Sequence, residues 1–203
     1  MRSLETLMFC LKLQRCPGIG LKKWQKLREQ TWKESSLENI YKKLPQVFSP
    51  KLLKEFYSTR LESQCLKEIE ESEKSQIKLI DWYDSDYPIL LKQSQWAQPI
   101  LSHYSEKPFQ YNQSFLLGIV GSRKSSPRAK TKLSILLDQF SNSNQLAIVS
   151  GRAMGIDQIA HQYALENNLN TLAVLGEGIE VFRDKNPRVN FDIFSQFFVS
   201  LIH

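Results

Sequence analysis

The chain has 203 residues, which is enough for one or two domains, and 41% of them are hydrophobic, which is enough for a folded core. Lys and Arg outnumber Asp and Glu by 27 to 21, so the formal net charge is +6 and an anionic partner is expected, with nucleic acid first. These values exclude a large multidomain assembly and a disordered chain.

The charge is distributed unevenly along the chain. Residues 1–60 carry thirteen Lys and Arg against five Asp and Glu, residues 61–114 carry five against nine, and residues 115–203 carry nine against seven. A basic block, an acidic middle and a mildly basic block indicate at least two units joined through the middle.

The three cysteines are an odd number and include no CxxC pair, so we expect neither a disulfide framework nor a four-ligand zinc site, and a cytoplasmic location fits best. The apolar N-terminus is interrupted by Glu5 and Lys12, and no cleavage site follows it. We therefore expect no export signal, and no apolar stretch is long enough to predict a membrane span.

The first 75 residues show helical periodicity throughout and predict a small all-helical N-terminal domain, of the helix-hairpin-helix or SAM-like kind, over residues 1–75. Proline and glycine mark its helix boundaries, and Pro50 suits a first helical position. Helices are predicted over residues 4–13, from Leu21, from Leu37 to the residue before Pro45, and from Pro50.

The turn between the first two helices is a candidate phosphate contact. It contains Gly18 and Gly20 and is followed by Lys22 and Lys23, which gives it the look of a helix-hairpin-helix, in which glycine amides meet a nucleic-acid backbone. A plain interhelical turn with a solvated lysine face is the alternative. Trp24 and Trp32 are expected in the core rather than as stacking platforms.

Residues 76–114 predict a connector that packs on its neighbour. A brief alternation of apolar residues from Ile77 to Trp82 indicates a strand, and prolines then punctuate an irregular stretch.

From Phe115 the pattern alternates between apolar runs and helical stretches. Strands are predicted over residues 116–120, where the strand should be buried, 146–149 and 171–175, with helices over residues 127–140 and 155–165. Right-handed crossovers turn this order into a parallel sheet with helices on its faces. The fold class is therefore α/β: a partial Rossmann-like sheet over residues 115–182, preceded by the helical domain and followed by a divergent tail over residues 183–203.

Small residues and cations follow the first two strands of this sheet, where ligands of open α/β sheets bind. Backbone amides, a hydroxyl and a guanidinium suit a phosphate. The alternative is that the glycines only make tight turns and the arginines are solvated. The candidate DNA-binding residues are Gly121, Ser122, Arg123, Lys124, Ser150, Gly151 and Arg152.

Catalytic residues are not expected. Asp157 and His161 lie four residues apart on one helix face, but a carboxylate in a first turn and a histidine that packs the helix explain them more simply. The sequence has no nucleophile elbow and no Walker lysine loop, its histidines are too scattered to predict a metal site, and no cofactor is expected.

Residues 117–181 resemble the DNA-processing protein A family (DprA, also called Smf). The resemblance rests on the segments 119–124, 149–151, 155–157, 160–161 and 174–176, and upstream on 86–88 and 99–101. It implies a cytoplasmic, non-enzymatic protein that binds single-stranded DNA during natural transformation, protects the strand and loads the RecA recombinase. By the family pattern, Gly121, Ser122, Arg123, Ser150 and Gly151 would line a positive pocket for the DNA backbone.

The resemblance ends at Phe182, where the family has a Tyr-Pro pair, and the further motifs of the family's Rossmann-like domain do not follow. We therefore expect a truncated member, with the missing motifs encoded downstream in another reading frame, and homodimerisation only if the missing half is not needed for it. Three parallel strands would leave an uncovered edge and face, unless apolar tail residues cover them. These are Phe191, Ile193, Phe194, Phe197, Phe198, Val199, Leu201 and Ile202.

Two other functions compete with this one. A nucleotide- or phosphoribosyl-binding enzyme could use a related scaffold, although the chain has no Pro-Gly-Gly-x-Gly-Thr loop. A non-functional fragment, in which only the helical unit folds, is the third hypothesis.

Overall fold

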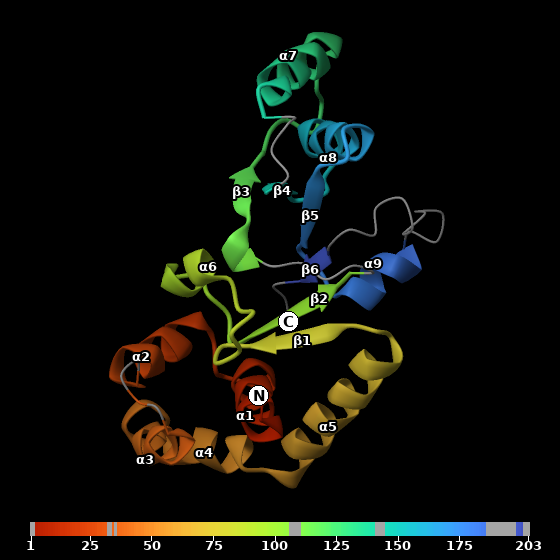
Figure 1. The fold of residues 1–203 in the computed structure, drawn as a ribbon. Coiled ribbons are helices and arrows are strands. Elements are labelled where there is room, and N and C mark those ends of the chain that lie inside the picture. Colours follow the sequence, from red (N-terminus) through yellow and green to blue (C-terminus); the bar gives the residue numbers. More distant parts are fainter. Residues whose placement is uncertain are drawn as a thin grey trace. The chain divides into compact units, whose positions relative to one another are not determined.

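The chain forms two compact units, Met1–Leu101 and Ser102–Ile202, in a computed structural model that describes residues 3–31, 34, 36–105, 111–140, 145–185 and 198–200 (Figure 1). The division between the units falls inside the segment 76–114 that the sequence identifies as a connector. Each unit is described by itself.

The first unit is helical up to Lys74, as the apolar periodicity predicts. Serine side chains cap three of its helices. Each accepts the backbone N–H of the residue three positions later in the chain, and the three are Ser3, Ser49 and Ser58. Its elements are α1 (Leu4–Arg15), α2 (Leu21–Thr31), α3 (Leu37–Val47), α4 (Pro50–Phe56), α5 (Thr59–Lys74), β1 (Lys78–Asp81) and α6 (Ile89–Gln93).

The prediction that the third helix stops before Pro45 is wrong. Pro45 is exposed and lies inside α3, which continues to Val47. The buried side chains of Leu44 and Phe48 hold this last turn on the core, and the Phe48 N–H donates to the Leu44 carbonyl at 2.8 Å. Tertiary packing therefore outweighs the local cost of the proline.

The core of the first unit is built on aromatic and leucine side chains. Phe9 is fully buried and meets Tyr41 and Phe56 edge-on, with ring centroids 5.1 and 6.0 Å apart. Trp24 is buried, which confirms its expected core position, and its indole N–H donates to the Ala97 carbonyl at 2.9 Å. Trp32 lies outside the described residues.

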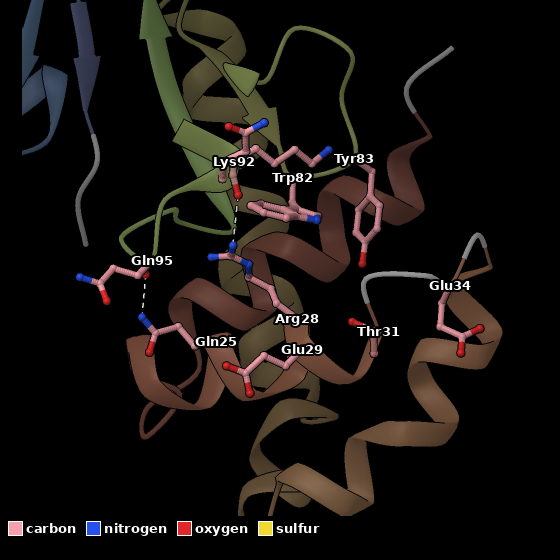
Figure 2. A pocket seen from close by; sticks show the side chains of 10 residues that line it. Gln25, Arg28, Glu29, Thr31, Glu34, Trp82, Tyr83, Lys92 and Gln95 are labelled. Carbon is pink, nitrogen blue, oxygen red and sulfur yellow. Dashed lines mark hydrogen bonds between the residues drawn. The ribbon is translucent and has the colours of Figure 1, made fainter. Parts of the chain in front are cut away.

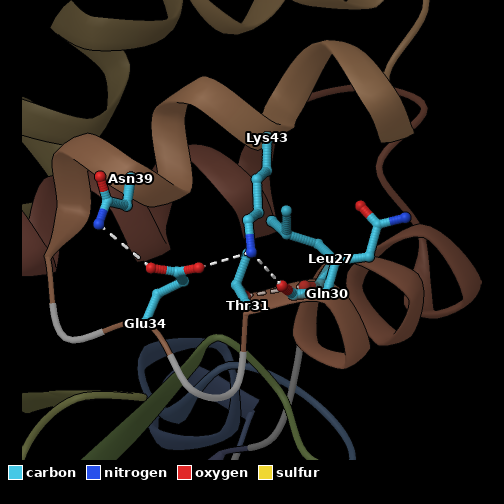
Figure 3. Close-up of polar contacts among 6 residues, drawn as sticks. All are labelled: Leu27, Gln30, Thr31, Glu34, Asn39 and Lys43. Atoms are coloured by element: carbon cyan, nitrogen blue, oxygen red, sulfur yellow. Dashed lines mark hydrogen bonds and ion pairs between the residues drawn. The ribbon is translucent and has the colours of Figure 1, made fainter.

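A polar cluster ties α2 to α3 (Figure 3). The Lys43 ammonium donates to the Gln30 carbonyl at 2.7 Å and to a Glu34 carboxylate oxygen at 2.5 Å, while Asn39 donates to the other oxygen of Glu34. These contacts hold the pKa of Glu34 below its usual value, mainly through the hydrogen bond from Lys43.

The second unit is an α/β layer structure, as predicted. Strands β3 to β6 run parallel, β2 pairs antiparallel with β6, and the order is β2-β6-β5-β4-β3. The elements are β2 (Ile100–Tyr104), a short 3-10 turn (Tyr111–Gln113), β3 (Phe115–Gly118), α7 (Pro127–Asp138), β4 (Leu146–Ser150), α8 (Ile156–Glu166), β5 (Asn170–Leu175), α9 (Ile179–Lys185) and β6 (Phe198–Ser200).

Three features of this sheet differ from the sequence predictions. β2 occupies part of the stretch predicted as irregular, and antiparallel pairing with β6 explains this because it is a long-range contact. The first strand of the β-α alternation, β3, is half-exposed at the edge of the described sheet and ends at Gly118, so that Val120 is 84% exposed rather than buried.

The tail supplies the third difference. β6 pairs with the edge of β5, with Val199 opposite Val174, so this edge is not left open. The other tail residues expected to cover the sheet, from Phe191 to Phe197 and at Leu201 and Ile202, lie outside the described residues.

The helices α7 and α8 pack over β4 through one apolar cluster. It includes Leu137, Ile148, Ala160 and Ala164, all fully buried. This cluster fixes α8 against the carboxyl ends of β3 and β4, where the candidate residues lie. Within the described ranges no helix has the length and apolar character needed to cross a membrane.

We expect Lys43→Met to lower the melting temperature by about 3 °C, because the change removes the hydrogen bonds from α3 to Gln30 of α2 and to Glu34 of the connecting segment. Lys42→Met is the matched control, since Lys42 makes only an exposed ion pair with Glu38 on its own helix. Thermal unfolding followed by circular dichroism measures both variants, and equal shifts would contradict the role given to Lys43.

Candidate nucleic-acid interface

The structure brings the two predicted turns together at one edge of the sheet. The Ile156 N–H at the start of α8 donates to the Ser122 carbonyl at 3.2 Å, which joins the second turn to the first. The Ser150 hydroxyl donates to the Ile119 carbonyl at 2.6 Å, which joins the end of β4 to the chain leaving β3. Gly121 to Lys124 and Ser150 to Arg152 therefore form one surface.

Two glycines make this close approach possible. Gly155 has a φ of +85°, and a Cβ built on it would lie 2.1 Å from the Ser122 carbonyl oxygen. A Cβ on Gly121 would lie 2.6 Å from the Ile156 side chain. Both positions therefore need glycine for packing, whatever else the turn binds.

The turn after β3 projects its cations into solvent. Arg123 and Lys124 are exposed, and neither makes an ion pair with a described residue. The Ser122 hydroxyl accepts the Lys124 N–H at 3.1 Å, which holds the turn in shape. This arrangement leaves two free positive charges on an ordered loop.

Sequence reasoning missed three further exposed cations that follow this turn in the sequence. Arg128, Lys130 and Lys132 are exposed on α7, directly after the turn. The signal was present in the sequence, because no Asp or Glu occurs between Phe115 and Leu137. The turn and α7 together form a basic segment, which we define as Arg123, Lys124, Arg128, Lys130 and Lys132.

The turn after β4 is more enclosed. Ser150 is only 3% exposed and its hydroxyl is used within the fold, whereas Gly151 is exposed. Arg152 is half-buried with a φ of +61°, and burial lowers the pKa of its guanidinium. Asp157 is buried in the first turn of α8 and accepts the Ala153 N–H at 3.3 Å, so its carboxylate already offsets the positive end of the helix.

His161 has the packing role expected of it. It is 1% exposed, and its Nδ1 lies 2.7 Å from the Thr171 hydroxyl, which itself donates to the Ile148 carbonyl. Nδ1 is therefore the donor in this pair. Burial, followed by the nearby charge of Arg152, lowers the pKa of His161 to about 4. Among the described residues no group of three His, Cys, Asp or Glu is placed to hold a metal ion.

The other candidate turn belongs to the first unit. Gly18 has a φ of +92°, and its carbonyl accepts a hydrogen bond from the Lys23 ammonium at 2.7 Å. The Gly20 carbonyl accepts the backbone N–H groups of Lys23 and Trp24 and so begins α2, while Lys22 is exposed. These contacts describe a tight interhelical turn, and its contact with phosphate stays a prediction.

The first unit also contains a pocket of about 840 Å³ that sequence reasoning missed (Figure 2). Its walls come from α2, from the chain that follows β1 and from α6. Because α2 lies far from the other two in the sequence, no local pattern indicates the pocket.

Parallel strands, crossover helices and glycine turns over the strands' carboxyl ends define the second unit as a Rossmann-like domain with exposed cations at one edge.

Comparison with known proteins agrees with this class. Residues 78–199 match the family described as DNA recombination-mediator protein A. The chain is 41% identical over 69 residues to the DNA processing protein DprA of Streptococcus pneumoniae, covering 34% of this chain and 24% of that protein. It is 28% identical over 164 residues to the protein Smf of Synechocystis, covering 77% and 41%.

A solved structure of DprA from Streptococcus pneumoniae shares the fold, with a TM-score of 0.61 and 22% identity over 99% of this chain and 68% of that one. The chain belongs to the DNA recombination-mediator protein A family. It spans less than half the length of the curated relatives it matches. The family match extends to residue 199, beyond Phe182, where the sequence motifs of the resemblance stop.

Lowering the pH from 7 to 5 should reduce the free energy of unfolding by about 2 kcal/mol through His161 alone. The unfolded imidazole takes up a proton below its usual pKa of 6.5, whereas the folded one, with a pKa of about 4, stays neutral. Urea unfolding of wild type and His161→Gln across this range measures the contribution. The variant should lose part of the pH dependence, and an unchanged slope would show that His161 does not titrate in this way.

Proposed function

We propose that this chain is a cytoplasmic, non-enzymatic protein that binds single-stranded DNA and passes the strand to the RecA recombinase during natural transformation. The observation that carries the proposal is the basic segment: five exposed cations on one turn and one helix, with no acidic residue among them. Membership of the recombination-mediator family and the resemblance of the turns to DprA support the same ligand.

The geometry favours contact with the DNA backbone. Arg123 and Lys124 are free to meet phosphates, and the exposed backbone of Ser122 and Gly151 lies on the same surface. Ser150 and Gly121 act beneath them by holding the turns together. Arg152 adds a third positive charge at this edge, so we propose that the strand crosses both turns.

The site supports binding rather than catalysis. The two residues that could be taken for an acid and base pair, Asp157 and His161, are buried and bonded within the fold. We propose that the Gly18 to Lys23 turn is at most an auxiliary backbone contact, because the Lys23 ammonium already bonds to Gly18.

Arg123→Ala should weaken binding of single-stranded DNA about tenfold, because a charge-assisted hydrogen bond to phosphate contributes about 1.5 to 3 kcal/mol. The slope of log affinity against log salt should become shallower by about 0.7. Fluorescence anisotropy of a labelled oligonucleotide, at two salt concentrations and against duplex of equal length, measures both quantities.

Lys67→Ala is the control for that experiment, since it removes one exposed positive charge from α5 in the first unit. If Arg123→Ala binds single-stranded DNA with wild-type affinity, the proposed binding site is wrong. Competition by a free nucleotide, with no preference for the polymer, would instead favour the nucleotide-binding enzyme. No binding by a folded preparation would favour the non-functional fragment.

Transfer to RecA is tested separately. On single-stranded DNA covered by single-strand binding protein, the chain should raise the rate of DNA-dependent ATP hydrolysis by RecA, and Arg123→Ala should not. An unchanged rate with a chain that binds DNA would remove loading from the proposal and leave binding. Size-exclusion chromatography with light scattering determines whether the chain forms the homodimer considered from its sequence.

A further inference from the structure

Cationic, aromatic, acidic and neutral polar side chains line the pocket of the first unit. Figure 2 shows the Trp82 indole between two cations, with Lys92 on one side and Arg28 on the other. The Arg28 guanidinium carbon lies 4.3 Å from the ring centroid of Trp82, and the Lys92 ammonium lies 5.0 Å from it. Tyr83 forms an adjoining wall, and three glutamine side chains, Gln25, Gln93 and Gln95, add neutral polar groups to the lining.

The two cations differ in their hydrogen bonds. Arg28 is fixed, because its terminal nitrogens donate to the carbonyls of Lys92 and Ser94 at the end of α6. It therefore serves as a helix cap and as a flat support for the indole.

Lys92 is left for a ligand. Its ammonium makes no hydrogen bond or ion pair with any described residue, and the flexible stem carries the charge over an aromatic face. Burial lowers the pKa of Lys92, so this ammonium is poorly hydrated for a surface lysine. An anion that binds the Lys92 ammonium replaces part of the favourable interaction with water that burial removes.

Four carboxylates bear on an anion at that end. The negative charges of Asp81 and Asp84 act on the Lys92 ammonium and raise its pKa, against the larger effect of burial. Glu34 is bonded to Lys43 and Asn39, so its charge is already matched. Glu29 is exposed, and Figure 2 shows it on the side of the pocket away from Lys92. The Lys92 end thus carries the two cations Lys92 and Arg28 against the carboxylates Asp81 and Asp84, and the lining along the glutamines is polar but uncharged.

We propose that this pocket holds one nucleotide unit of single-stranded DNA, with a phosphate at Lys92 and the base against Tyr83 and the glutamine side chains. A cation beside aromatic rings is the combination that single-strand binding sites use. The volume of about 840 Å³ accommodates such a unit, and glutamine amides can meet the donors and acceptors of a base edge. This inference rests on the proposed function, because it names a second contact for the same ligand.

The test compares Lys92→Gln, which keeps the side-chain stem, with Lys92→Arg, which keeps the charge. Lys92→Gln should weaken binding of single-stranded DNA about fivefold in anisotropy, and Lys92→Arg should restore most of it. Lys67→Gln, at an exposed position of α5, should behave as wild type. Circular dichroism melts confirm that each variant folds.

Photocrosslinking locates the contact. Oligonucleotides with 5-iododeoxyuridine, irradiated with the full chain and mapped by mass spectrometry, should label the segment that contains Trp82 and Tyr83. Wild-type affinity in Lys92→Gln together with no crosslink there would overturn the pocket assignment, while Arg123→Ala would still report on the other site.

The two proposals fail in different ways. If the wild-type chain binds no single-stranded DNA, the proposed function fails, and saturation-transfer NMR with deoxycytidine monophosphate then tests the pocket alone. Transfer that Lys92→Gln abolishes would show a nucleotide pocket independent of DNA binding. No transfer would overturn the pocket as well.

Discussion

The contact between Gly155 and the Ser122 carbonyl is the constraint on which the second unit depends. A side chain at position 155 would occupy the space of that carbonyl, and the positive φ there suits only glycine well. The contact sets where α8 begins, and the start of α8 in turn places Asp157 and the buried His161. The packing of Gly155 against the Ser122 carbonyl therefore sets the shape of the exposed turn after β3. The exposed side chains of that turn are not needed to hold this shape.

Around the two turns an anion lies buried and cations lie exposed. The buried carboxylate of Asp157 meets the positive end of α8 from within, while the cations of the basic segment stand in solvent. A phosphate approaching this edge therefore meets side chains before it meets the helix end. Cations spread along a turn and a helix suit the repeated charge of a phosphate backbone better than they suit one enclosed anion, in agreement with the proposed ligand.

Local signals predicted much of the fold, and long-range pairing accounts for what they missed. Pro50, the glycine turns and the apolar runs correctly predicted the start of α4 and the β-α alternation. The end of α3 depends on the burial of Phe48, and β2 depends on β6, nearly a hundred residues away. The basic segment was visible in the sequence as a stretch without acids, whereas the pocket at Trp82 required α2 and α6 to be brought together first.

The perpendicular contact of Trp24 with Trp82, at 5.4 Å between ring centroids, has a spectroscopic consequence. All four tryptophans occur in the first 101 residues, so indole absorption and emission arise from the helical unit alone. Two indoles held at a fixed angle couple their transitions and give a near-ultraviolet circular dichroism signal that disappears when the packing is lost. The loss of order in one half of the chain can thus be observed without any label, while the backbone signal reports on both halves.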